Sequence, residues 1–136
     1  MIELHPATVH FPVALLITGG ISWMVALIRQ EGRFRQFGFW LHTLGLAGVG
    51  LAIITGNLEL PLDINEKGQA TLDYHQTLSY VIAWLFAMLW IWVFMRGASM
   101  SPAEGWTFTA VYWVCLSFVF WTSWLGGKLV YEYGAG

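Results

Sequence analysis

Four histidines are the residues of this 136-residue chain whose type and position suit cofactor or metal chemistry. His5, His10 and His75 each lie just before a long apolar stretch, whereas His42 lies inside one. Imidazole is a common axial ligand of haem iron and also binds copper and zinc. It equally forms hydrogen bonds to backbone carbonyls or water. The histidines therefore predict either a cofactor or metal site or a set of structural hydrogen bonds.

The elements that must position these histidines follow from the charge distribution. Only 10% of the residues are charged and 57% are hydrophobic, whereas about 25% of an average globular chain is charged. The charged residues leave four gaps, each long enough for a transmembrane helix of about 20 residues. We expect one domain, residues 1–136, that folds as an all-α antiparallel four-helix bundle in a membrane. Its spans are predicted near residues 11–28, 37–56, 77–95 and 106–126.

Other groups that enzymes and transporters use are missing from these spans. They contain no Asp, Glu, Lys or Arg, so the sequence offers no carboxylate proton relay, no voltage sensor and no Ser-His-Asp set. The single cysteine, Cys115, excludes an intramolecular disulfide and a Cys-rich metal site. A net charge of −2 provides no basic surface for nucleic acid. We therefore expect neither a stand-alone enzyme, nor an ion channel, nor a nucleic-acid-binding protein.

The distribution of arginines predicts the orientation of the bundle. The first linker carries three arginines, whereas the second linker, residues 57–76, carries four acidic residues against one lysine. We therefore expect the first and third linkers in the cytoplasm, and the second linker and both termini on the exterior side. His5, His10 and His75 then lie at the exterior membrane edge, and His42 lies about 10 Å into the membrane from the cytoplasmic side.

A b-type haem with two histidine ligands needs them on different helices at one depth. His10 and His75 meet this requirement and are predicted as its axial ligands, with His5 nearby as a neighbour or alternative ligand. The three histidines together would instead suit a copper or zinc site. His5 and His10 point about 140° apart on a helix, so joint coordination needs a break in the helix. Pro6 and Pro12 are expected to permit such a break.

His42 has no second histidine at its depth and is predicted to be structural. A histidine within a membrane must find a hydrogen-bond partner, and Thr43, Thr18 or a backbone carbonyl is expected in this role. If the protein holds two haems, His42 is the natural inner ligand. Small residues share its helix face by spacing: Gly45, Ala52 and Gly56. They favour close helix packing in lipid, and near Gly56 they would equally leave room for a flat macrocycle.

Two sequence features predict how the fourth span begins and ends. Ser101 followed by Pro102 is typical of a helix N-terminus. Gly126 and Gly127 are expected to weaken or redirect the helix at the exterior face. The chain after them would then lie at the membrane interface and bring Tyr131 close to the exterior histidines, where it would contact a cofactor.

Short motifs run along the whole chain in order. They are HPATVHFP from His5, TG at Thr55, the histidine His75 before the third span, and GGKLVYEYG from Gly126. With these motifs the chain resembles the bacterial four-helix membrane family known as domain of unknown function two-two-three-one. The resemblance implies a bacterial inner (cytoplasmic) membrane and, because some relatives are joined to c-type cytochrome domains, redox work at the exterior face. Relatives often carry His where this chain has Tyr133, so a ligand role at that position is absent here.

The leading hypothesis is a small membrane electron-transfer protein, similar to a b-type cytochrome, with haem b near the periplasmic edge. It would sit in the lipid bilayer and pass electrons between a quinol or a larger membrane complex and a periplasmic cytochrome. One alternative is a non-catalytic structural or accessory subunit of a larger respiratory or photosynthetic complex. Another alternative is a copper or zinc site formed by His5, His10 and His75.

Overall fold

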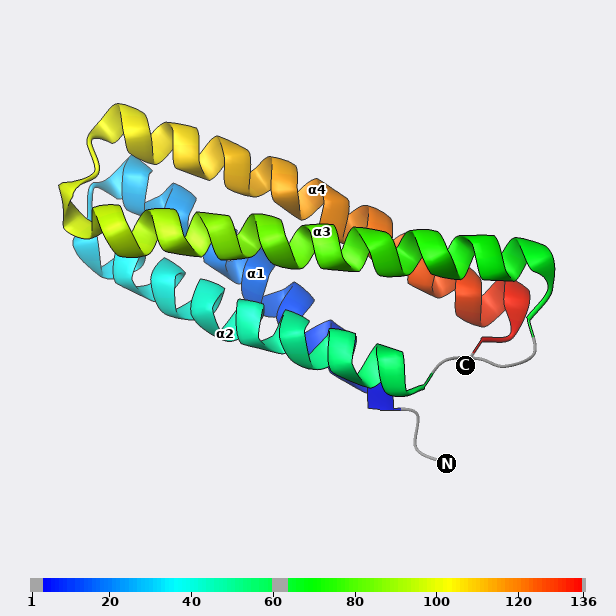
Figure 1. The fold of residues 1–136 in the computed structure, drawn as a ribbon. Helices are drawn as coiled ribbons and strands as arrows, with labels where there is room; N and C mark the ends of the chain where they lie inside the picture. Colours follow the sequence, from blue (N-terminus) through cyan, green and yellow to red (C-terminus); the bar gives the residue numbers. More distant parts are fainter. Residues whose placement is uncertain (1–3, 60–63, 136) are drawn as a thin grey trace.

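The computed structural model describes residues 4–59 and 64–135, which form four long helices (Figure 1). They are α1 (Leu4–Arg29), α2 (Gly32–Leu58), α3 (Glu66–Arg96) and α4 (Pro102–Tyr133), with a short 3₁₀ turn, η1 (Gly97–Ser99), before α4. Each of these four helices is long and apolar enough to cross a membrane. The prediction of an all-α, multi-pass membrane protein is therefore confirmed.

The helices are longer than the predicted spans. The shortest of the four, α1, has 26 residues and is therefore about 39 Å long, compared with about 30 Å for the hydrocarbon core of a bilayer. The helix ends thus reach into the headgroup region. As a consequence, His5 and His10 lie within the first two turns of α1, and His75 lies within α3 rather than before it.

Polar side chains cap the N-termini of α3 and α4. The side chain of Asn65 accepts a hydrogen bond from the backbone N–H of Gly68 at 2.9 Å, at the start of α3. The Ser101 hydroxyl accepts from the backbone N–H of Glu104 at 3.2 Å, at the start of α4. Both satisfy amide groups that the first helical turn leaves without a partner. The prediction that Ser101 begins the fourth helix is confirmed.

Figure 1 shows two antiparallel hairpins, α1 beside α2 and α3 beside α4. The starts of α1 and α3 lie at one end of the bundle with the ends of α2 and α4, and we call this end the histidine end because it carries His5 and His75. The turns between α1 and α2 and between α3 and α4 lie at the opposite end. We call it the arginine end, after Arg29, Arg33 and Arg35.

Glycines of α2 allow α1 and α2 to approach closely. A Cβ atom added at Gly45 would lie 2.8 Å from Leu16 Cδ2, and one added at Gly48 would lie 3.0 Å from Pro12 Cβ. Small residues at such contacts are the usual means of packing helices in lipid, where the hydrophobic effect does not hold them together. The predicted small-residue face of α2 is therefore a helix-packing seam.

An aromatic pair within the α3–α4 hairpin supports the contact of this hairpin with α1. Phe86 of α3 and Tyr112 of α4 are fully buried, with ring centroids 5.2 Å apart and an edge-to-face geometry. Tyr112 also reaches α1, where its hydroxyl donates to the carbonyl oxygen of Leu16 at 3.1 Å. These contacts fix the position of α1 relative to α3 and α4, and hence the relation between histidines on different hairpins.

The expected break in the first helix is wrong. Helix α1 is continuous from Leu4 to Arg29 through both prolines. Pro6 lies in the first turn, where a missing N–H removes no helical hydrogen bond. Pro12 does remove one, but its ring is buried against Gly48 of α2. Tertiary packing therefore stabilises a helix that proline on its own would weaken.

The expected redirection of the fourth helix is also wrong. Helix α4 continues through Gly126 and Gly127 and ends at Tyr133, where Gly134 adopts the left-handed conformation with a φ of 67°. Leu125 and Leu129, one turn apart on either side of the glycines, are both buried. Burial of this face stabilises the helix across the glycine pair, so the chain does not turn back over the bundle.

Candidate functional site

Two histidines from different hairpins face each other at the histidine end. The rings of His5 on α1 and His75 on α3 have centroids 6.3 Å apart and planes 85° apart. Both side chains are half-buried. The aromatic core sets this relation, because α1 and α3 belong to different hairpins and meet only through the packing of the bundle.

His5 is held by two groups of α2. Its Nδ1 lies 2.9 Å from the carbonyl oxygen of Ala52 and 3.3 Å from the hydroxyl of Thr55. A carbonyl oxygen only accepts, so Nδ1 carries the proton in the neutral ring and Nε2 carries the free lone pair. The backbone N–H of His5 donates to the Glu59 carboxylate at 3.0 Å, which ties the start of α1 to the end of α2.

His75 is held in the same way by α4. Its Nδ1 lies 3.0 Å from the carbonyl oxygen of Thr122, so this nitrogen is again the donor and Nε2 again has the free lone pair. The two histidines therefore share one tautomer, although they lie on different helices and use carbonyls of different helices. A carbonyl on one ring nitrogen is the usual support of a histidine that binds a metal through the other.

Each ring also packs against a glycine. A Cβ atom added at Gly56 would lie 2.9 Å from Cε1 of His5, and one added at Gly126 would lie 3.3 Å from Cε1 of His75. The first distance is shorter than real Cβ contacts allow, so His5 occupies space that only glycine leaves free at position 56. The glycine pair at 126–127 was predicted to weaken or redirect the helix. Instead, Gly126 leaves the space in which the His75 ring packs against α4.

The centroid distance of the two rings can be compared with that of two imidazoles bound to one ion. Metal–nitrogen bonds of about 2.0–2.1 Å on each side, with the ring radii added, place the centres of two facing imidazoles roughly 6 Å apart. The observed separation of 6.3 Å agrees with this value. A bis-histidine haem would likewise need two imidazoles, and His5 and His75 would be the residues to hold it.

The other predicted residues of this end lie elsewhere. His10 is exposed and points about 140° away from His5 on the continuous α1 helix, so the structure brings His5, not His10, together with His75. Tyr131 is 90% exposed on α4 and lines a surface hollow with Trp124 and neighbouring residues.

The three histidines of this end do not form one cluster. Within residues 4–59 and 64–135, no group of three or more His, Cys, Asp or Glu side chains is arranged to hold a metal ion. The continuous helix explains this arrangement, because it points His5 and His10 about 140° apart and separates them by about 7.5 Å along its axis.

His42 has different surroundings. It is fully buried, and its Nε2 lies 3.0 Å from the carbonyl oxygen of Phe86 on α3, so the expected carbonyl partner is confirmed. The rings of Phe86 and Tyr112 contact it edge-on, with centroids at 5.6 Å and 5.2 Å. Its Nδ1 has no hydrogen-bond partner within the part of the chain that the structure describes. His42 therefore links α2 to α3 in the middle of the bundle.

Sequence reasoning missed the groups that orient the rings of His5 and His75. The partners are the backbone carbonyls of Ala52 and Thr122. Every residue has a carbonyl, so the residue type does not reveal which one is used. Gly126 does leave a signal, since a glycine in an apolar helix marks a close approach by another group. A search for glycines at the depth of each histidine would have found both Gly56 and Gly126.

The whole chain matches one protein family. A family model described as "Predicted membrane protein (DUF2231)" covers residues 1–136. Comparison with curated proteins and with solved structures finds no match.

Proposed function

Since this chain belongs to the DUF2231 family of predicted membrane proteins, we propose that it is a small electron-transfer protein with a b-type haem held by His5 and His75. The resemblance noted in the sequence is thus confirmed at the level of the family. The family description names no activity, so the proposal depends on the arrangement of the two histidines.

The observation that carries the proposal is the pair of facing imidazoles with matched tautomers. Both Nδ1 atoms are bound to backbone carbonyls, and the ring centroids are 6.3 Å apart. When bound, a haem would supply a one-electron iron couple. The carbonyls of Ala52 and Thr122 would hold the ring orientations and increase the basicity of the two Nε2 atoms. Since these carbonyls belong to helix backbone, the ligands would be held before any cofactor arrives.

The position of the pair suits exchange with a partner outside the membrane. His5 lies in the first turn of α1, at the end of the bundle remote from the three arginines. On the positive-inside rule we place this end at the periplasmic face of a bacterial inner membrane. An electron donor or acceptor of the periplasm, or a quinol at the same membrane edge, would then reach the site without crossing the bundle.

The test is a dithionite-reduced minus oxidised visible spectrum of the detergent-purified protein, with iron, copper and zinc measured on the same sample. We expect stoichiometric iron and the sharp α-band of a bis-histidine haem. His5→Ala and His75→Ala should remove the band, whereas His10→Ala should retain it. His10 is the matched control because it is an exposed histidine of the same helix, about 7.5 Å further along its axis.

Other results would replace the proposal by a definite alternative. A colourless protein with stoichiometric copper or zinc would make the pair part of a metal site. A folded protein with neither chromophore nor metal would favour the structural or accessory subunit, whose partners co-purification would then identify. Loss of the band in His10→Ala but not in His5→Ala would restore His10 and His75 as the ligand pair.

A further inference from the structure

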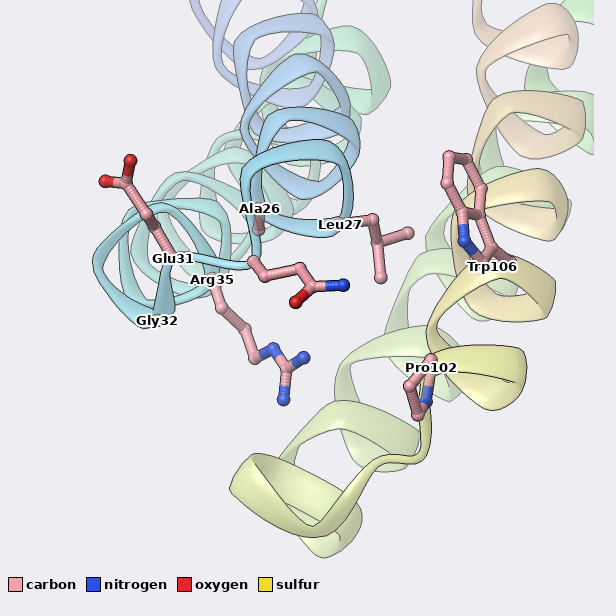
Figure 2. Close-up of a pocket in the computed structure, with 8 residues that line it drawn as sticks. Ala26, Leu27, Glu31, Gly32, Arg35, Pro102 and Trp106 are labelled. Carbon is pink, nitrogen blue, oxygen red and sulfur yellow. The ribbon is translucent and has the colours of Figure 1, made fainter.

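A cleft at the arginine end lies between the α1–α2 turn and the start of α4 (Figure 2). It has a volume of about 380 Å³ and is separate from the histidine pair, which lies at the opposite end of the bundle. None of its residues was predicted from the sequence to form a binding site. The proposed electron transfer therefore gives this cleft no role.

The walls of the cleft are apolar. Ala26 and Leu27, near the end of α1, face Pro102 and Trp106, at the start of α4 (Figure 2). Leu27 closes the gap between the two helices, since a Cβ atom added at Gly105 would lie 2.7 Å from Leu27 Cδ2. Trp106 is 50% exposed, which is usual for tryptophan at a membrane–water interface.

The mouth of the cleft is positively charged. Arg29 and Arg33 both lie near the Glu31 carboxylate, with N–O distances of 3.4 Å and 2.6 Å. Arg35 is different, because it makes no ion pair or hydrogen bond with any residue in 4–59 or 64–135. Figure 2 shows its side chain extending into the space before Pro102, while that of Glu31 points away from this space. The cleft thus holds an uncompensated guanidinium.

Gln30 adds a hydrogen-bonding group to the same mouth. It lines the cleft and has a φ of 53°, the left-handed conformation that residues other than glycine rarely adopt. An amide and a guanidinium both donate hydrogen bonds to phosphate oxygens, and a guanidinium does so in a two-pronged geometry.

We propose that this cleft binds an anionic phospholipid, with its phosphate at Arg35 and Gln30 and its acyl region against Leu27 and Trp106. Charge complementarity selects an anion, and the apolar walls at the end of membrane-spanning helices select one with a hydrocarbon part. A free phosphate would use the mouth but leave the apolar walls in water. In the orientation proposed above, the lipid belongs to the cytoplasmic leaflet.

The test is native mass spectrometry of the full-length protein in detergent, titrated with phosphatidylglycerol or phosphatidylcholine. We expect one phosphatidylglycerol to bind about tenfold more tightly than phosphatidylcholine, as one charge-assisted contact provides. Arg35→Gln should remove this preference. Arg33→Gln is the matched control, because it removes the same charge two residues away from Arg35 and outside the cleft lining. It should retain the preference.

A second variant keeps the test decisive if Arg35→Gln fails to fold. Gln30→Gly suits the left-handed backbone at this position, so it should fold at least as well as the wild type while binding phosphatidylglycerol severalfold more weakly. Equal losses in Arg33→Gln and Arg35→Gln would overturn the proposal in favour of general charge attraction. Competition by inorganic phosphate at the affinity of the lipid would overturn it in favour of a free-anion site. Equal binding of the two lipids would overturn the preference for an anionic headgroup.

Discussion

The histidine pair and His42 show how one residue type has different roles in two regions of the same bundle. All three rings use a nitrogen on a backbone carbonyl of another helix. In the pair, that nitrogen is Nδ1 and another imidazole lies opposite. In His42, it is Nε2, and the rings opposite belong to Phe86 and Tyr112. The hydrogen bond to a carbonyl is common to all three histidines. The neighbouring ring, imidazole or hydrocarbon aromatic, is the feature that distinguishes a candidate ligand from a structural link.

The largest expected effect is on haem binding, where rescue by added imidazole should distinguish His75 from His42. His75→Gly should reduce haem affinity more than about 100-fold because it removes a ligand, and added imidazole should restore the reduced α-band by filling the space. His42→Gly should leave the band unchanged with or without imidazole. Titration of the apoprotein with haem, followed by the visible spectrum, measures both. If His42→Gly also lost the band and imidazole restored it, the comparison would fail and His42 would be a ligand.

The next effect concerns stability in the middle of the bundle. His42→Ala should lower the free energy of unfolding by about 3 kcal/mol, since it leaves a cavity among buried aromatic rings and removes the link to Phe86. His42→Gln, which keeps an N–H donor, should lower it by about 1 kcal/mol. Reversible unfolding by SDS titration in mixed micelles measures both. Equal stabilities of the Ala variant and the wild type would show that the buried ring contributes no net packing energy.

A smaller effect concerns the glycine under His5. Gly56→Ala places a Cβ atom 2.9 Å from the ring, so it should displace His5 and weaken cofactor binding about tenfold, with a loss of about 1–3 kcal/mol in stability. The control is Gly50→Ala on the same helix, which meets nothing within 4 Å and should bind normally. Haem titration and SDS unfolding of the two variants provide the comparison. Identical behaviour of the pair would mean that the space under His5 is not required.

The smallest expected effect distinguishes two adjacent glycines of α4. Gly126→Ala meets Cε1 of His75 at 3.3 Å, a contact that a slight shift of the ring relieves, so cofactor affinity should fall only severalfold. Gly127→Ala meets nothing within 4 Å and should increase stability by up to about 1 kcal/mol through helix propensity. The same two titrations apply. A larger loss of affinity at position 127 than at position 126 would contradict the placement of His75 on Gly126.

The sequence-based reasoning succeeded where the property is local. Four charge-free stretches predicted four helices, and Ser101 with Pro102 predicted the start of the last one. The carbonyl partner of His42 was expected because a buried imidazole has few alternatives in lipid. The reasoning failed where packing overrides local preference, at Pro12 in α1 and at the glycine pair in α4.

The membrane-spanning character of the chain and the number of its helices were determined by the sequence alone. These properties depend on the sum of apolar residues along a segment and on a fixed rise per residue, so no knowledge of neighbours is needed. Tertiary structure alone decided that His5, rather than His10, faces His75. The two α1 histidines lie about 7.5 Å apart along the helix and point about 140° apart, so the rotation and axial position of α1 decide which of them meets His75. That rotation is set by side chains of the other three helices, through the glycine seam of α2 and the aromatic contacts of α3 and α4.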